Sequence, residues 1–149
     1  MAHYRKVETL IWNDEKFNGL SREAKLLFLC VLTHPNLTVL GAMRASARGL
    51  GEELQLTSEE LEEAFGELLS KQLIRYEYGA AFLWLPNFLK YNPPESPNVV
   101  KSWESAVSYL PECALKRELM QGAVKVVGGL GKSFQGALPA CFAEFIEKD

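Results

Sequence analysis

The sequence predicts a mainly α-helical fold with one small β-hairpin. One observation is a capping signal: Thr57 is followed three residues later by Glu60, and this spacing lets hydroxyl and carboxylate bond the free N–H groups of a first helical turn. A second is a change of period, because apolar residues recur at helical spacing after Thr57 but alternate from Ile74 onward. The third is a tight turn at Gly79-Ala80, between the two alternating runs.

The predicted helix has an apolar stripe and an acidic face. The stripe consists of Leu61, Phe65, Leu68 and Gln72, widened by Ala64 and Leu69, and the other face carries Glu59, Glu62, Glu63, Glu67 and Lys71. The alternating residues of the hairpin are Ile74, Tyr76 and Tyr78, followed by Phe82 and Trp84. A helix, a strand, a tight turn and a second strand form the ending of a winged helix-turn-helix.

The residues before this stretch supply the beginning of the same fold. Ser21 is predicted to cap a helix that Pro35 ends. The unbroken apolar run from Leu26 to Leu32 makes this helix apolar on every side and central to the core. Residues 39–43 are short and apolar, and we expect them to form a first strand that pairs with the hairpin.

A second helix is predicted over residues 47–54, with Ser46 as its N-cap and with Ala47, Leu50 and Leu54 facing inward. Gly49 and Gly51 each cost it about 1 kcal/mol relative to Ala, so tertiary packing must hold it. Residues 4–19 are expected to form a short strand or an extended arm with a turn.

Four prolines between Leu85 and Asn98 mark the edge of this domain. We therefore divide the chain into a winged-helix domain, residues 1–92, and a helical C-terminal extension, residues 93–149. In the extension, residues 99–109 predict a helix that places Val100, Trp103 and Val107 on one face, and further helices are expected from Pro111 and from Pro139. Residues 122–136 are rich in glycine and are expected to form a linker.

The composition indicates a globular chain. Its 149 residues are 48% hydrophobic and 23% charged, which is enough for one core. The N-terminus lacks the apolar segment of a secretory signal and the chain lacks an apolar run of a spanning helix, roughly 20 residues. We expect a cytoplasmic protein without a membrane partner. Cys30, Cys113 and Cys141 are widely spaced in apolar surroundings, as reduced buried thiols are.

Residues 5–92 resemble the N-terminal winged-helix domain of phage and prophage replication proteins, the group that includes DnaD-like primosomal proteins and phage replisome organisers. The most distinctive matching stretches are WNDEKFNGLS, which leads into the first helix, and NFLKYN, which follows the hairpin. The middle stretch, LGEELQLTSEELEEAFGELLSKQLIRYE, is one that many winged-helix transcriptional regulators also show. The resemblance implies a role at an origin or primosome through DNA binding, self-association or both. The chain departs from the longer members of this group, because its C-terminal 50 residues show no recognisable helicase-loading or ATP-binding module.

The net charge of −3 argues against extensive DNA contact, because nonspecific affinity comes mainly from neutralising phosphates. The helix that normally enters the major groove is acidic here, and the turn from Tyr78 to Ala80 carries no Lys or Arg. The remaining candidates for DNA contact are Arg44, Arg48, Lys71, Arg75, Lys90 and Lys101. Arg44 and Arg48 are the expected phosphate contacts, with Lys90 and Lys101 extending the track.

Two other readings stay open. The hairpin aromatics Tyr76, Tyr78, Phe82 and Trp84 have the chemistry to stack on bases of single strands, although we assign Phe82 and Trp84 to the core. Alternatively, the acidic helix beside a basic patch fits self-association or a basic protein partner without DNA contact. A transcriptional regulator built on the same domain is the further alternative.

The sequence does not favour catalysis. Its histidines, His3 and His34, lie far apart and in no cluster with metal-ligand spacing. Residues 128–133, GGLGKS, resemble a phosphate loop only superficially, since two residues separate Gly128 from Gly131 where four are required. We therefore expect a protein that is not an enzyme and has no cofactor, metal site or small-molecule substrate.

Overall fold

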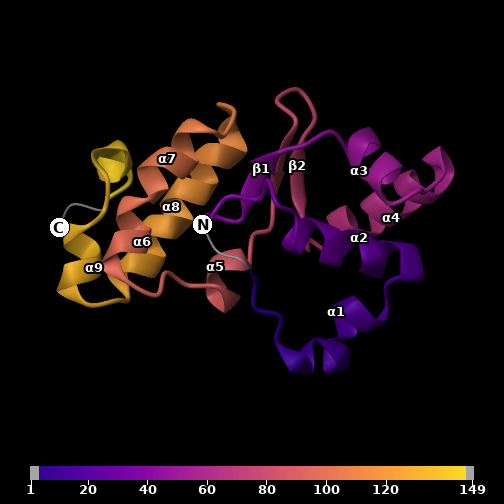
Figure 1. The fold of residues 1–149 in the computed structure, drawn as a ribbon, viewed down its shortest axis with the longest axis horizontal. Coiled ribbons are helices and arrows are strands. Elements are labelled where there is room, and N and C mark those ends of the chain that lie inside the picture. The colour runs from indigo at the N-terminus through magenta and orange to yellow at the C-terminus, as the bar shows by residue number, and fades with distance from the viewer. Residues whose placement is uncertain (1–3, 147–149) are drawn as a thin grey trace.

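The structure is a computed structural model that describes residues 4–146 (Figure 1). Over these residues the chain is mostly helical with a small three-stranded sheet, which confirms the predicted fold class. The helices are α1 (Glu15–Asn18), α2 (Arg22–Leu32), α3 (Ala47–Glu53), α4 (Ser58–Ser70), α5 (Phe88–Tyr91), α6 (Pro97–Lys101), α7 (Trp103–Ser108), α8 (Ala114–Gly128) and α9 (Lys132–Gly136). Two 3-10 segments, η1 (Thr9–Asn13) and η2 (Ala140–Phe145), lie near the ends.

The sheet consists of β1 (Ala42–Arg44), β2 (Arg75–Glu77) and β3 (Phe82–Trp84). The strands lie in the order β1-β3-β2, and both pairs are antiparallel. Trp84 of β3 stands opposite Ala42 on one side and Arg75 on the other. The strand expected near residues 39–43 therefore forms and pairs with the hairpin, and the elements from α2 to β3 follow the predicted order.

The three predicted helix caps are confirmed. Ser21 and Ser46 accept from the N–H groups of Ala24 and Gly49 at 3.1 and 2.9 Å. Thr57 and Glu60 form the full capping box, in which the Glu60 N–H donates to Thr57 Oγ1 at 3.1 Å and the Thr57 N–H donates to Glu60 Oε1 at 2.9 Å. Each cap depends only on residues three apart, so the sequence contains the whole signal.

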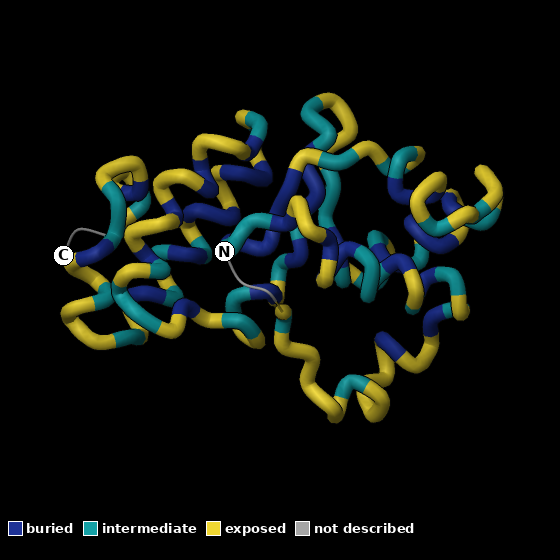
Figure 2. The backbone as a smooth tube through the Cα atoms, in the orientation of Figure 1, coloured by how far each residue is buried: buried dark blue, intermediate teal, exposed yellow. Residues whose placement is uncertain are grey.

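The sheet separates two hydrophobic cores (Figures 1 and 2). On one face Met43 and Leu83 pack with residues of α2, α3 and α4. On the other face Ala42 and Phe82 pack with α6, α7, α8 and η2, including Val100, Trp103 and Val107. Figure 1 shows α6–α9 on one side of the strands and α2–α4 on the other. The C-terminal helices thus complete the fold of the sheet, because they cover its second face.

The glycine-rich stretch is helical where we predicted a linker. Helix α8 continues to Gly128, and α9 begins at Lys132 after a short turn. The helix is held by an apolar face, with Leu119, Ala123 and Val127 buried in the second core. The expected helix start at Pro111 was also wrong, since α8 begins at Ala114. Burial here outweighs the low helix propensity of glycine.

Several details of the predicted N-terminal half were wrong. Of the two alternatives for residues 4–19, the strand does not form: residues 4–8 have no regular secondary structure, and the short helices η1 and α1 follow them. Helix α2 was predicted to be buried on every side, but Leu26 of this helix is 47% exposed. Gln72 does not continue the buried stripe of α4, because the helix ends at Ser70 and Gln72 has a φ of 58°. None of the helices within residues 4–146 is long and apolar enough to cross a membrane.

Candidate nucleic-acid interface

The exposed face of α4 carries acidic side chains. Glu59, Glu62 and Glu63 are exposed, while the carboxylate of Glu60 is engaged in the capping box. Glu67 turns toward α2, where it accepts from the Ser21 N–H at 2.8 Å and from the Ser21 hydroxyl at 2.5 Å. Three unshielded carboxylates on one helix face repel phosphate oxygens, so this face is unsuited to the major groove.

The turn between β2 and β3 spans Tyr78 to Ala81 and carries no cation. Tyr78 is 69% exposed, and its ring lies edge-on to Tyr76 at 4.8 Å. Tyr76 is not free to stack on a base, because it packs against Phe65 at 5.2 Å and its hydroxyl donates to the Ala45 carbonyl at 2.7 Å. Burial raises the pKa of the Tyr76 hydroxyl.

The other hairpin aromatics belong partly to the core. Phe82 is fully buried, as predicted, whereas Trp84 is only half-buried, with the Arg75 guanidinium 5.6 Å from its ring centroid. Tyr78 is therefore the hairpin aromatic that is most exposed to a partner.

Arg44 and Arg48 lie at the corner between β1 and α3. Arg44 ends the strand, Arg48 is in the first turn of the helix, and Ser46 between them is the helix cap. Both side chains are exposed, and neither has a carboxylate within 4.0 Å among residues 4–146. Two such guanidinium groups four residues apart are suited to contact neighbouring phosphates.

Lys71 and Arg75 are instead held by the protein. Lys71 donates from Nζ to the carbonyl of Lys16 at 3.1 Å, which ties the end of α4 to α1. Arg75 pairs with Glu118 of α8 at 3.0 Å between Nη1 and Oε2 while its guanidinium covers Trp84. The Arg75–Glu118 pair joins β2 to helix α8. Both Lys71 and Arg75 are therefore less available for DNA.

Lys90 and Lys101 are exposed, but they do not extend a track from the β1–α3 corner. Lys90 is in α5, with its Nζ 5.3 Å from the ring centroid of Tyr91. Lys101 ends α6, which lies on the opposite side of the sheet from α3 (Figure 1). The six sequence candidates are thus spread over the molecule, and one pair of them, Arg44 and Arg48, forms a local basic site.

The described residues contain no group of three or more His, Cys, Asp and Glu side chains that could hold a metal ion. His3 lies outside the described residues. His34 bonds Glu53 through Nε2 at 2.9 Å and accepts the Asn36 N–H at Nδ1, so both ring nitrogens are used within the fold. Residues 128–133 begin at the last residue of helix α8 and follow no strand, which is not the context of a phosphate loop.

The cysteines only partly fit the predicted buried thiols. Cys30 and Cys113 are half-buried, whereas Cys141 is exposed. Burial raises the pKa of the Cys30 thiol, and the nearby carboxylate of Glu53 adds to this. Burial also raises the pKa of Cys141. A raised pKa keeps the thiol protonated and lowers its reactivity.

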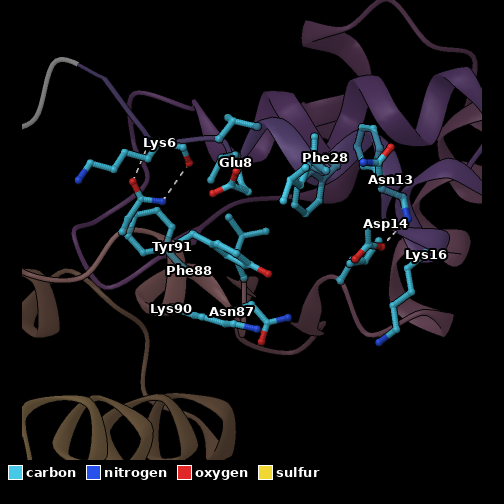
Figure 3. Close-up of a pocket in the computed structure, with 18 residues that line it drawn as sticks. Lys6, Glu8, Asn13, Asp14, Lys16, Phe28, Asn87, Phe88, Lys90 and Tyr91 are labelled. Atoms are coloured by element: carbon cyan, nitrogen blue, oxygen red, sulfur yellow. Dashed lines mark hydrogen bonds between the residues drawn. The ribbon is translucent and has the colours of Figure 1, made fainter. Parts of the chain in front are cut away.

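One surface was missed from the sequence. The arm from Lys6 to Lys16 arches over the ends of α2 and α5 and encloses a groove of about 500 Å³ (Figure 3). The aromatic residue of the arm, Trp12, does not mark this groove, because its ring packs edge-on against Phe17 at 5.2 Å and it is not among the lining residues. Periodicity does not find such a groove, since its walls come from segments about eighty residues apart in the chain.

Comparisons with protein-family models, curated proteins and solved structures find no match to this chain. The function is therefore inferred from the residues of the chain and their geometry.

Proposed function

We propose that this chain is a winged-helix protein of the phage-type replication-initiation class, which is not an enzyme and which binds DNA through the corner between β1 and α3. The observation that carries this proposal is the succession α2, β1, α3, α4, β2, β3 with the strand order β1-β3-β2. This succession supports a winged helix because the hairpin returns beside the first strand after two helices.

The two distinctive stretches of the resemblance give further support, because residues of both line the same groove. WNDEKFNGLS forms the end of η1, α1 and the cap of α2, and NFLKYN forms α5. Asn92, the last residue of NFLKYN, accepts the Lys6 N–H at 2.8 Å and donates to the Lys6 carbonyl at 3.2 Å. The N-terminal arm and α5, which are far apart in the chain, are thus joined beside the core that contains α2, α3 and α4.

DNA contact through Arg44 and Arg48 explains how an acidic protein binds a polyanion. Neither guanidinium group has a carboxylate partner within residues 4–146, whereas the acidic face of α4 disfavours the usual insertion into the major groove. Contacts to phosphates position a protein on DNA but carry no sequence information. The proposed binding is accordingly salt-sensitive and largely independent of sequence.

Fluorescence anisotropy of labelled single- and double-stranded DNA at two salt concentrations tests this proposal. We expect binding that weakens as salt increases and that the double substitution Arg44→Glu/Arg48→Glu abolishes. The matched control is Lys125→Glu/Lys132→Glu, which reverses two exposed charges in α8 and α9. Absence of binding at low salt would refute DNA contact. An equal loss of DNA affinity in the two variants would refute the assignment of the binding site to Arg44 and Arg48.

A second candidate function is protein binding without DNA contact, and the exposed carboxylates of α4 favour it. A basic partner, or a basic site on another copy of the chain, would complement Glu59, Glu62 and Glu63. Light scattering of the purified chain over a range of concentrations and at two salt concentrations separates the two candidates. Association that salt and the triple substitution of these residues by Gln both weaken would favour the protein-binding function.

A further inference from the structure

The groove under the N-terminal arm is a built feature of the fold. Near one end the arm is fixed by Arg5, which donates from Nη2 to the Leu37 carbonyl at 2.8 Å, and by the two hydrogen bonds between Lys6 and Asn92. At the other end Asp14 caps α1 by accepting the Phe17 N–H at 3.0 Å. The arm is thereby fixed at both ends of the groove, and Ile11 between them packs against the N-terminal core.

The interior of the groove is apolar. Its walls include Ile11 from the arm, Phe28 and Leu32 from α2, Leu73, Leu85 and Phe88. Figure 3 shows Phe28 and Phe88 between the arm and α5. A volume of about 500 Å³ falls in the range of roughly 300 to 1,000 Å³ of ligand-binding pockets, so the space is large enough for several apolar groups.

Apolar side chains also extend beyond the groove onto the surface around it. Leu10 is 63% exposed, Val7 40% and Tyr91 45%, and all three border the groove. Trp12, on the same arm, is 60% exposed. A small ligand inside the groove would leave these side chains in water, whereas a larger partner would cover them. The apolar rim therefore indicates a protein segment.

The charges at the rim determine which kind of segment fits. Lys16 and Lys90 border the groove, are exposed, and have no carboxylate within 4.0 Å in the part of the chain that the structure describes. Lys6, in contrast, pairs with Glu95 at 3.3 Å. Glu8 and Asp14 also border the groove, but each accepts a hydrogen bond within the arm, Glu8 from the Thr9 hydroxyl at 3.4 Å and Asp14 from the Phe17 N–H at 3.0 Å. A continuous polyanion such as single-stranded DNA would pass both carboxylates and be repelled, whereas a segment with a few carboxylates can place them at the two lysines. Two free lysines beside an apolar interior complement a few carboxylates next to apolar anchors.

We propose that this groove binds an amphipathic segment of a partner protein, with its apolar side chains in the groove and its acidic residues at Lys16 and Lys90. The inference is independent of DNA contact at Arg44 and Arg48, because the two sites use different residues. The recognition mode is an apolar helix face laid into a groove, with the flanking charges setting specificity.

Nuclear magnetic resonance of the isotope-labelled full chain tests the proposal with a synthetic peptide of about four helical turns. The probe peptide carries Leu and Phe on one face and Glu and Asp on the other. Two matched peptides carry Lys in place of the acidic residues, or Ser in place of the apolar ones. We expect the acidic peptide to shift amide signals of residues 6–17 and 85–92, and the matched peptides to bind at least about tenfold more weakly.

Charge reversal provides the specific control. The Lys16→Glu/Lys90→Glu variant should lose the acidic peptide and gain the Lys-substituted one, a reversal that simple loss of folding does not produce. Lys125→Glu/Lys132→Glu should bind as the parent chain does, since both residues are exposed and border neither wall. The proposal is overturned if the acidic peptide causes no shift at concentrations on the order of 1 mM, if both charged peptides bind equally, or if a thymidine oligonucleotide shifts the same amides.

Discussion

Phe82 and Leu83 are neighbours in β3, yet they bury their side chains in two different cores. Phe82 lies with Trp103 and the C-terminal helices, and Leu83 lies with Leu27 and the helices of the N-terminal half. Both are fully buried. Because successive side chains of a strand point to opposite faces, one short strand joins the two halves of the molecule.

This arrangement predicts one cooperative unfolding transition for the whole chain. Phe82→Ala should destabilise by about 3–5 kcal/mol and Leu83→Ala by about 2–5 kcal/mol, since each opens a cavity in a packed core. Urea unfolding followed by circular dichroism and by tryptophan fluorescence should give coincident curves for both variants. Tyr109→Ala, at a 76% exposed site, is the control and should change stability by less than about 0.5 kcal/mol. Two separate transitions in the Phe82→Ala variant would contradict this prediction.

Local signals in the sequence were sufficient for much of the fold. Ser21, Ser46 and Thr57 were predicted as caps, and the buried stripe of α4 was correct at Leu61 and Phe65, because each signal involves residues within one helical turn. The change of period after α4 was sufficient to predict that the hairpin follows this helix.

The remaining features depend on contacts between distant segments. The burial of Phe82 beside Leu83 breaks the alternation expected of a strand with one buried face, because the C-terminal helices cover the second face. The helical state of residues 122–128 likewise depends on that packing. At the candidate site, the exposure of Arg44 and Arg48 is as predicted, whereas the pairing of Arg75 with Glu118, forty-three residues later, has no local signal.

Gly41 should be irreplaceable by alanine. Its φ is +78°, and a Cβ built on it would lie 2.3 Å from Cβ of Phe88, the first residue of α5. The strain of the left-handed conformation and the clash together should cost about 2–5 kcal/mol. Gly66→Ala is the matched control, because Gly66 is an exposed residue in the middle of α4 with open space around its Cβ, and it should stabilise by about 0.5–1 kcal/mol. The midpoints of urea unfolding measure both effects, and a Gly41→Ala chain as stable as the parent would be inconsistent with this geometry.

The two hydrogen bonds between Ser21 and Glu67 should stabilise the contact between α2 and α4. Removing the carboxylate in Glu67→Ala leaves the half-buried Ser21 N–H without its acceptor, which should cost about 1–3 kcal/mol. For a chain of this size the melting temperature should fall by roughly 2–4 °C per kcal/mol. Glu63→Ala, at an exposed position on the same helix, should have little effect. Equal melting temperatures for the two variants would show that the Ser21–Glu67 interaction contributes nothing.

Tyr76 should make stability depend on pH in the alkaline range. Burial raises the pKa of its hydroxyl above the ordinary value of about 10, because the folded protein disfavours the phenolate. A group whose pKa is raised by folding contributes stability that is complete below the unfolded pKa and is lost as pH rises through the folded one. The hydrogen bond from Tyr76 to the Ala45 carbonyl depends on the same proton, since only the neutral hydroxyl donates.

The Tyr76→Phe variant isolates this effect. At neutral pH it should be less stable than the parent chain by about 1 kcal/mol, because the Ala45 carbonyl loses its donor. The difference should shrink above pH of about 10, where the parent loses stability through Tyr76 and the variant does not. Tyr109→Phe, at an exposed tyrosine, controls for general alkaline effects and should follow the parent. Urea unfolding at several pH values measures the difference in the free energy of unfolding between the parent chain and the variant. A difference that stays constant as the pH rises through the tyrosine pKa of about 10 would rule out Tyr76 as the titrating group.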